Sequence, residues 1–390
     1  MMYPSFLTVN YGGSELYVVP SMHFNHVFAW EVNKICSHLN TDLEAIAVEL
    51  GTDILLSATN LFRELHVGSE TFKELPVMLG IMKQNRMIRA SLKGKVLQLQ
   101  KETGKDLSEL SPEMLHREIG FSGYSVLFLS PVDSIIEAIR CGIELNTPIY
   151  GIDLEEMADS LFRPIHVQDP LEANKDFIDY IVRNAPFAQA QRDDEIDCRR
   201  EIAMAARLKA LLKDYRRVLF VCGMAHWLKI KRLLNDSSIR PAIIPNGQPC
   251  REFKRVVVHP QIAVQYMDLF PMLVTAYEKV RMPVNRASKE KGKKGCLEPA
   301  KIFYKGLRKT YKHYFVPKNQ ELHPLKWNQD LENIQNFETY LANLCMLNYR
   351  SVPDLFIAIK SAQELMRHEY VKTFTKVLIK FPWAHPEKFP

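Results

Sequence analysis

The stretch Val218-Leu-Phe-Val-Cys-Gly223-Met-Ala-His226 decides the fold. Its apolar run ends at a glycine, and a histidine and a helical pattern follow, so it predicts a buried strand that turns into a helix. The run Leu16-Tyr-Val-Val-Pro20-Ser-Met-His23 repeats this arrangement near the start of the chain. Histidines that end two such strands fall at the carboxyl edge of an α/β sheet, where ligand sites lie. His23 and His226 therefore predict one shared site.

Outward from these two runs, the first 250 residues alternate apolar runs with helical patterns. This alternation indicates an α/β fold with a mainly parallel sheet flanked by helices, and two patterns inside 70–103 indicate a helical insertion. The predicted strands are Glu15–Pro20, Ala45–Leu50, Val126–Ser130, Pro148–Leu154, Arg217–Cys222 and Ala242–Pro245. The predicted helices are Val27–Leu39, Glu70–Met82, Asn85–Thr103, Ser134–Gly142, Leu171–Asn184, Asp193–Lys213 and Trp227–Leu234, with one more in Pro260–Arg281.

Charge is concentrated in one part of the chain. The 390 residues carry a net charge of +6, whereas Arg281–His313 alone holds eleven Lys and Arg against two acidic residues. Apolar residues make up 47% of the chain, enough for a sizeable core and for two domains. We expect an α/β hydrolase-like domain over 1–281, a basic linker over 282–315 and a C-terminal helical region over 316–390, with helices at Asp330–Asn348 and Val352–Lys380.

Several classes of protein are disfavoured. No run of 18 apolar residues predicts a membrane span, and the first residues lack the pattern of a secretory signal. Seven dispersed cysteines without a Cys-x-x-Cys pair favour reduced thiols and a cytoplasmic setting. The glycine-rich nucleotide-binding motifs are absent, and Gly120-Phe-Ser-Gly123 falls short of Gly-x-Ser-x-Gly, which argues against a serine hydrolase.

Carboxylates follow two further predicted strands. Glu49 and Asp153 each end an apolar run, and a buried carboxylate is costly unless a metal, an arginine or a protonated histidine pairs with it. Taken singly, each is explained as a cap of the following turn. Together with the two histidines they favour one site at the sheet edge. His26, three residues after His23, either binds beside it or points away.

The helical pattern that starts at Asp193 carries Arg199-Arg200-Glu201. Arg200 and Glu201 are placed to face the site, and Arg199 to face solvent. A surface ion pair is the alternative reading of these charges.

The order of these motifs resembles the superfamily of TIKI/TraB and erythromycin-esterase/ChaN-like proteins over about residues 10–250. The matching segments are Pro20-Ser-Met-His23, Val48-Glu49-Leu50, Ile152-Asp153-Leu154, Arg200-Glu201-Ile-Ala-Met204-Ala205 and Gly223-Met-Ala-His226. The resemblance implies an α/β fold with a site built from two histidines, the strand glutamate and the arginine. Members of the superfamily include metal-dependent peptidases and enzymes that open esters. Pro20 departs from the pattern, since the family usually has glycine there, and proline lacks an N–H donor.

The function expected on this basis is metal-dependent hydrolysis of peptide or ester bonds. His23, Glu49 and His226 are the candidate ligands of a divalent Mn, Co or Zn ion with one open position. Glu49 either completes this ligand set or takes a proton from the water, Arg200 stabilises the oxyanion, and Asp153 is the further carboxylate at the sheet edge. The substrate is then a peptide or an ester.

The alternative is a catalytically degenerate binding or regulatory module. In that case Pro20 marks lost chemistry, and the basic region 281–313 docks to nucleic acid or to an acidic partner. Tyr304, Tyr311 and Phe315 lie among Lys and Arg there, a mixture suited to phosphate contact and base stacking. A solvated linker followed by a packed helix explains the same residues.

Overall fold

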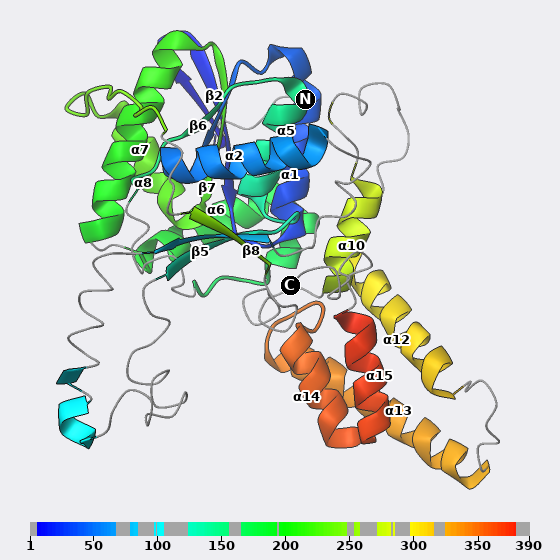
Figure 1. Ribbon diagram of the computed structural model, residues 1–390. Coiled ribbons are helices and arrows are strands. Elements are labelled where there is room, and N and C mark those ends of the chain that lie inside the picture. Colours follow the sequence, from blue (N-terminus) through cyan, green and yellow to red (C-terminus); the bar gives the residue numbers. More distant parts are fainter. Residues whose placement is uncertain are drawn as a thin grey trace.

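The computed structural model has an α/β fold, with a mainly parallel sheet between two layers of helices (Figure 1). The sheet has the order β1-β2-β7-β3-β6. Strands β2, β7, β3 and β6 are parallel, and only β1 runs antiparallel to β2. The strands are β1 Thr8–Tyr11, β2 Ser14–Ser21, β3 Ala45–Val48, β6 Ile149–Gly151 and β7 Arg217–Gly223. The structure describes residues 6–67, 79–84, 97–98, 100–104, 124–155, 165–192, 195–247, 253–257, 271–281, 284, 297–315 and 324–379.

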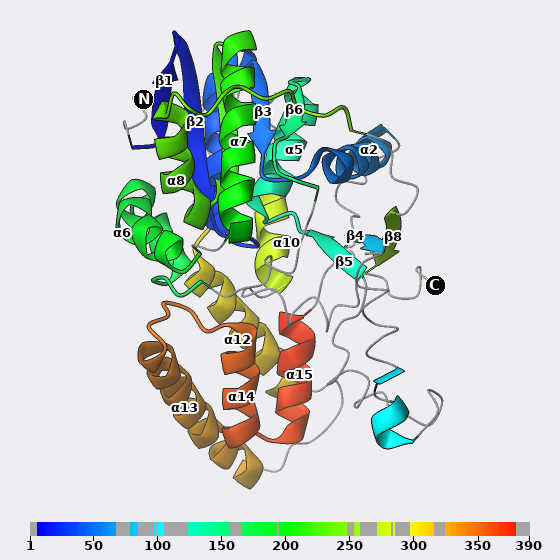
Figure 2. The same cartoon turned by 90° about the vertical axis from the view of Figure 1, so that its left-hand side faces the viewer.

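The strands read as continuous apolar runs because helices cover both faces of the sheet. Successive side chains of β7 alternate between two cores: Leu219 and Val221 pack on one face, and Val218 and Phe220 on the other. The first face is covered by α1 His26–Leu39, α2 Thr52–Val67 and α5 Ser134–Leu145. The opposite face is covered by α7 Glu195–Asp214 and α8 Met224–Asn235, with α6 Phe177–Ala190 beside α8 (Figure 2).

Most of the predicted elements in this domain are confirmed, and two strands need correction. Ala242–Pro245 is not a strand: the chain is irregular there, and Ile243 is 92% exposed. Val126–Ser130 does form a strand, β5 Tyr124–Leu129, but it belongs to a second, antiparallel sheet with β4 Leu79–Gln84 and β8 Phe253–Val257. Leu171–Asn184 is divided into the short helix η5 Pro170–Asn174 and α6. Another short helix, η1 Asn40–Asp42, follows α1.

The predicted insertion lies largely outside the described residues. Of its first helix, Glu70–Met82, the described end Leu79–Met82 belongs to β4 and is strand. Helix α2 was not predicted, although its apolar residues recur at helical spacing. The further helix expected in Pro260–Arg281 is present as α10 Pro271–Val280.

The C-terminal region is helical, as expected, but it begins earlier than the sequence indicated. Residues 282–315 were predicted to be a basic linker, and their second half is helix α12 Pro299–Phe315. Phe303 and Leu307 of α12 are buried in one core with α13 Pro324–Leu347, α14 Leu355–Leu365 and α15 His368–Leu378. These four helices lie together beside the α/β layers in both views (Figures 1 and 2). None of the described helices combines the length and apolar character that a membrane span requires.

Helix α10 is fastened to the α/β layers by a buried ionic network, which we call the Arg281 cluster: Arg281, Glu137, Glu144, Arg140 and Glu278. Arg281 Nε donates to both carboxylate oxygens of Glu137 at 2.9 Å, and its Nη1 donates to Glu144 at 2.8 Å. Arg140 makes a bidentate pair with Glu278, at 2.6 and 3.1 Å. These groups lie on α5 and at the end of α10.

Candidate functional site

The carboxyl ends of the four parallel strands carry the residues singled out in the sequence. His23 follows β2, Gly223 ends β7 and His226 lies in the next turn, Glu49 follows β3, and Asp153 follows β6. Because these strands are neighbours in the sheet, their ends form one continuous edge. The expectation that these residues share one edge of the sheet is confirmed.

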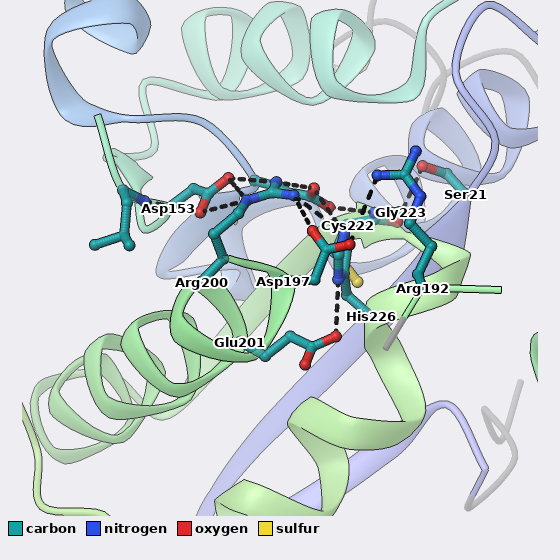
Figure 3. Close-up of polar contacts among 11 residues, drawn as sticks. Ser21, Asp153, Arg192, Asp197, Arg200, Glu201, Cys222, Gly223 and His226 are labelled. Atoms are coloured by element: carbon teal, nitrogen blue, oxygen red, sulfur yellow. Dashed lines mark hydrogen bonds and ion pairs between the residues drawn. The ribbon is translucent and has the colours of Figure 1, made fainter. Parts of the chain in front are cut away.

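Arg200, on α7, stands at the centre of this edge and pairs with three carboxylates (Figure 3). Its Nε and Nη2 donate to Asp153, with the shortest distance 2.6 Å, and its Nη1 donates to Asp197 Oδ1 at 2.9 Å. Nη2 also donates to Glu49 Oε1 at 2.6 Å. We call these residues, together with His226, the Arg200 cluster. As expected, Arg200 and Glu201 face inward and Arg199 faces solvent.

His226 lies in the first turn of α8 and contacts groups on both sides of its ring. Nδ1 is 2.9 Å from Glu201 Oε1, while Nε2 is 3.4 Å from both Glu49 Oε1 and Arg200 Nη1. Burial opposes the charged ring, but the nearby Glu49 and the bond to Glu201 outweigh it and raise the pKa of His226. A protonated ring donates to both carboxylates, so His226 and Arg200 together offset part of the buried negative charge, and Lys229 lies 3.3 Å from Glu201.

Glu49 is buried and stays ionised. Burial alone would raise its pKa, yet the charges of His226, Arg200 and His23 lower the pKa to about 2. Its Oε2 accepts the backbone N–H of Gly223 at 2.5 Å. A Cβ at Gly223 would lie 3.2 Å from that oxygen, so glycine lets the β7 backbone approach the carboxylate closely.

His23 differs from the other members because its side chain is 39% exposed. Its Nδ1 lies 3.0 Å from Asp133 Oδ2, and the same oxygen accepts the backbone N–H of Phe24. Phe24 has φ +59, a left-handed turn that these bonds hold in place. Burial lowers the pKa of His23, but Asp133 and then Glu49 raise it above its ordinary value. His23 thus lies within the field of Glu49, with Nδ1 held by Asp133.

Asp133 was not identified from the sequence. It is the N-cap of α5, and its Oδ1 accepts from Ile135 N at 2.9 Å, which is the role that an aspartate before a helical pattern normally suggests. Its second oxygen reaches a histidine 110 residues earlier in the chain. No local pattern gives this second role. Asp197 was missed for a similar reason, since an i, i+3 Asp–Arg pair on a helix is typical of a surface.

Pro20 is accommodated by the strand pairing. In β2 the N–H of Val18 points to the β1 side, where it donates to Leu7 O, so the nitrogen of Pro20 points to that side as well. The pairing of β1 with β2 extends only to Tyr17. The missing donor therefore removes no ladder bond, which is the situation in which sheets tolerate proline.

The observed geometry does not suit His23, Glu49 and His226 as ligands of one metal ion. In the described part of the chain, no three His, Cys, Asp or Glu side chains are placed to hold one ion. Both oxygens of Glu49 accept bonds from the protein, and His226 faces the Arg200 guanidinium, whose fixed positive charge occupies the centre of the carboxylates.

Comparison with known proteins neither supports nor contradicts this resemblance. No protein-family model, no curated protein and no solved structure matches this chain. The likeness to the TIKI/TraB and erythromycin-esterase/ChaN-like superfamily remains a prediction that rests on the order of the five segments.

Proposed function

We propose that the chain is a hydrolase of peptide or ester bonds, with His23 as the general base. The observation that supports this most is the Asp133–His23 pair, whose ring also feels the charge of Glu49. One ring nitrogen is fixed by a carboxylate, the ring is partly exposed, and the surrounding site is buried. Such a carboxylate–imidazole pair is the arrangement by which proteins position a base for proton transfer.

In the proposed step, a water molecule gives its proton to His23 Nε2 as it attacks the scissile carbonyl. Asp133 holds the ring with its proton on Nδ1, and the permanent charge of Glu49 stabilises the imidazolium that forms. The proton then passes from Nε2 to the leaving amine or alcohol. The products are a carboxylic acid and the amine or alcohol, and water is the only reactant consumed besides the substrate.

Two features are available to stabilise the negative charge of the intermediate. Helix α8 begins directly after β7, and its N-cap is Gly223, which has no side chain to accept from the first N–H groups. These donors and the positive end of the helix suit a developing oxyanion. Arg200, which the sequence suggested for this role, is surrounded by carboxylates, so we assign it to positioning Glu49.

The experiment is hydrolysis of peptide and ester libraries by the full chain, with product detection by mass spectrometry. We expect turnover by the wild type, a loss of at least about 100-fold in Glu49→Gln, and no loss in the surface variant His38→Ala. Parallel reactions contain a chelator or added Mn²⁺, Co²⁺ or Zn²⁺, which tests the predicted metal requirement. Turnover that survives chelation supports the ion-free step, and turnover that needs a metal overturns it.

A catalytically degenerate binding module is the second candidate. It is favoured by the Arg200 cluster itself, because the donors of its arginine are used within the protein. Under this alternative, no library member is cleaved faster by the wild type than by Glu49→Gln.

A further inference from the structure

A hollow of about 210 Å³ lies between α12 and α13 in the C-terminal region. Its walls are mainly apolar, with Phe303 and Leu307 from α12, Leu341 from α13, and Val352 from the loop that follows. Glu338 and Arg350 add one charge of each sign to the lining. A wider hollow of about 600 Å³ shares Met346 with it and continues toward η5 and α6. The first hollow suits one large apolar side chain, since apolar walls favour an apolar occupant.

Large apolar side chains line the two hollows although water reaches them. Met346 is 74% exposed, and Tyr349 is 89% exposed. Tyr349 also has φ +52 at the end of α13, where a helix normally ends with glycine or asparagine. Tyr304 of α12 lies at the edge of the hollow and is exposed as well. Grouped exposed apolar residues of this kind mark interaction surfaces.

A row of cations runs along α12 beside the hollow: Lys305, Arg308, Lys309 and Lys312, which we call the α12 stripe. The residues of α12 that line the hollow are Ala300, Phe303, Tyr304 and Leu307. Arg308 follows Tyr304 by one helical turn and is the cation of the stripe that lies next to the hollow, whereas the other three lie farther around the same helix. All four cations are exposed, and no carboxylate in the described ranges forms an ion pair with them. From Lys305 to Lys312 the stripe is roughly 10 Å long.

We propose that the hollow and the α12 stripe together dock an acidic peptide segment with one large apolar anchor residue. The anchor fills the apolar hollow, and carboxylates on the same segment complement the stripe. An extended peptide covers roughly 10 Å in three residues, so about four of its residues span the stripe. Nucleic acid is the alternative occupant, since Tyr304 offers a base an aromatic face, but the apolar walls favour an apolar side chain over the polar edges of a base. The proposal is independent of the hydrolase activity.

The test uses a displayed library of random 12-residue peptides, selected on the full chain. We expect enrichment of peptides that carry a large apolar residue flanked by Asp or Glu. The enriched peptide, labelled with fluorescein, is then titrated against three variants. Ala342→Phe fills the hollow from the exposed side of α13, Lys305→Glu/Arg308→Glu reverses the stripe, and Lys372→Glu is the matched control on α15.

We expect binding to weaken at least tenfold in Ala342→Phe and in the stripe variant, and to change less than twofold in Lys372→Glu. Higher salt weakens binding to the wild type and has less effect on the stripe variant. Thermal unfolding of each variant establishes that it is folded. No enrichment, or enriched peptides that bind Ala342→Phe equally well, overturns the proposal. Stripe-dependent binding of a single-stranded oligonucleotide or anionic vesicle, with no peptide selected, assigns the surface to that partner instead.

Discussion

The Arg200 cluster and the Arg281 cluster are built from the same groups, yet they serve different purposes in our account. Each centres on a buried arginine that pairs with several carboxylates at 2.6–3.2 Å. The Arg281 cluster joins α5 to α10. The Arg200 cluster lies at the ends of four parallel strands, and its Glu49 acts electrostatically on His23, whose side chain is partly exposed. Buried ion pairs are therefore no sign of function by themselves, and position in the fold distinguishes the two.

Removal of either arginine is expected to give the largest effect on stability. Arg200→Met removes the cation shared by Glu49, Asp153 and Asp197, and Arg281→Met removes the one shared by Glu137 and Glu144. We expect each change to lower the free energy of unfolding in urea by about 3–5 kcal/mol. A loss below about 1 kcal/mol for Arg200→Met would contradict the paired geometry. Folded Arg281→Met should keep any hydrolytic activity, and folded Arg200→Met should lose it.

His26 provides a pH-dependent test of the same region. Both ring nitrogens are buried without a hydrogen-bond partner, and burial lowers the pKa of His26 to about 4. The unfolded chain therefore binds the proton between pH 6.5 and 4 while the folded chain does not, so stability falls as the pH falls through this window. The loss amounts to ~3 kcal/mol by pH 4. In His26→Phe the slope of unfolding free energy against pH should flatten, whereas His38→Ala should retain it.

The substitution Asp133→Asn separates the two roles of Asp133, which are to cap α5 and to pair with His23. Asparagine caps a helix as well as aspartate does, so we expect a stability loss of about 1 kcal/mol or less at neutral pH. Without the carboxylate, the pKa of His23 falls. The pH at which the rate of a His23-dependent reaction rises should therefore be lower in the variant than in the wild type. Wild-type His23 contributes stability below about pH 6.5 that is lost as pH rises through its raised pKa, and the variant should lack this loss.

The control for that variant is Asp354→Asn, which changes the same kind of cap on α14 and lies outside the site. An unchanged pH–rate profile in Asp133→Asn would show that Asp133 acts as a cap alone.

The smallest effect is expected at Gly223. Its φ is −60, which any residue adopts, and a Cβ would meet Glu49 Oε2 at 3.2 Å. Gly223→Ala should cost less than about 1 kcal/mol, since the carboxylate has only to shift by a few tenths of an ångström. The initial rate should fall further than the loss of folded protein explains. Initial rates and unfolding in urea, measured on the same variant, check this. A severe loss of stability would mean that the carboxylate cannot give way.

Much of the fold follows from the sequence because burial on both faces leaves continuous apolar runs, as in β2, β3 and β7. The prediction of a strand at Ala242–Pro245 is wrong because an apolar run does not guarantee a neighbouring strand to pair with. Here Ile243 faces water. The many basic residues of Pro299–Phe315 favoured a linker over a packed helix, and the packed helix is what α12 is, with Phe303, Leu307 and Thr310 on its buried face. Composition over a window does not reveal such a face, whereas its helical spacing does.

The site residues could be read from the sequence as far as strand ends and helix phase determine them. His23, Glu49, Asp153, Arg200 and His226 all lie at the expected edge. Their partners could not be derived in the same way. Asp133 contacts His23 across 110 residues of chain, and whether Arg200 meets carboxylates or a substrate depends on side-chain packing that no local pattern encodes.

The most direct test of the account is the hydrolysis rate and the free energy of unfolding of wild type and His23→Ala, measured on the same preparations. We predict a rate lower by about 100-fold or more, with the free energy of unfolding changed by no more than about 1 kcal/mol, since the ring is partly exposed. Equal rates in the two proteins, or a rate that is lost only as far as the variant unfolds, would contradict the role of His23 and with it the distinction between the two clusters.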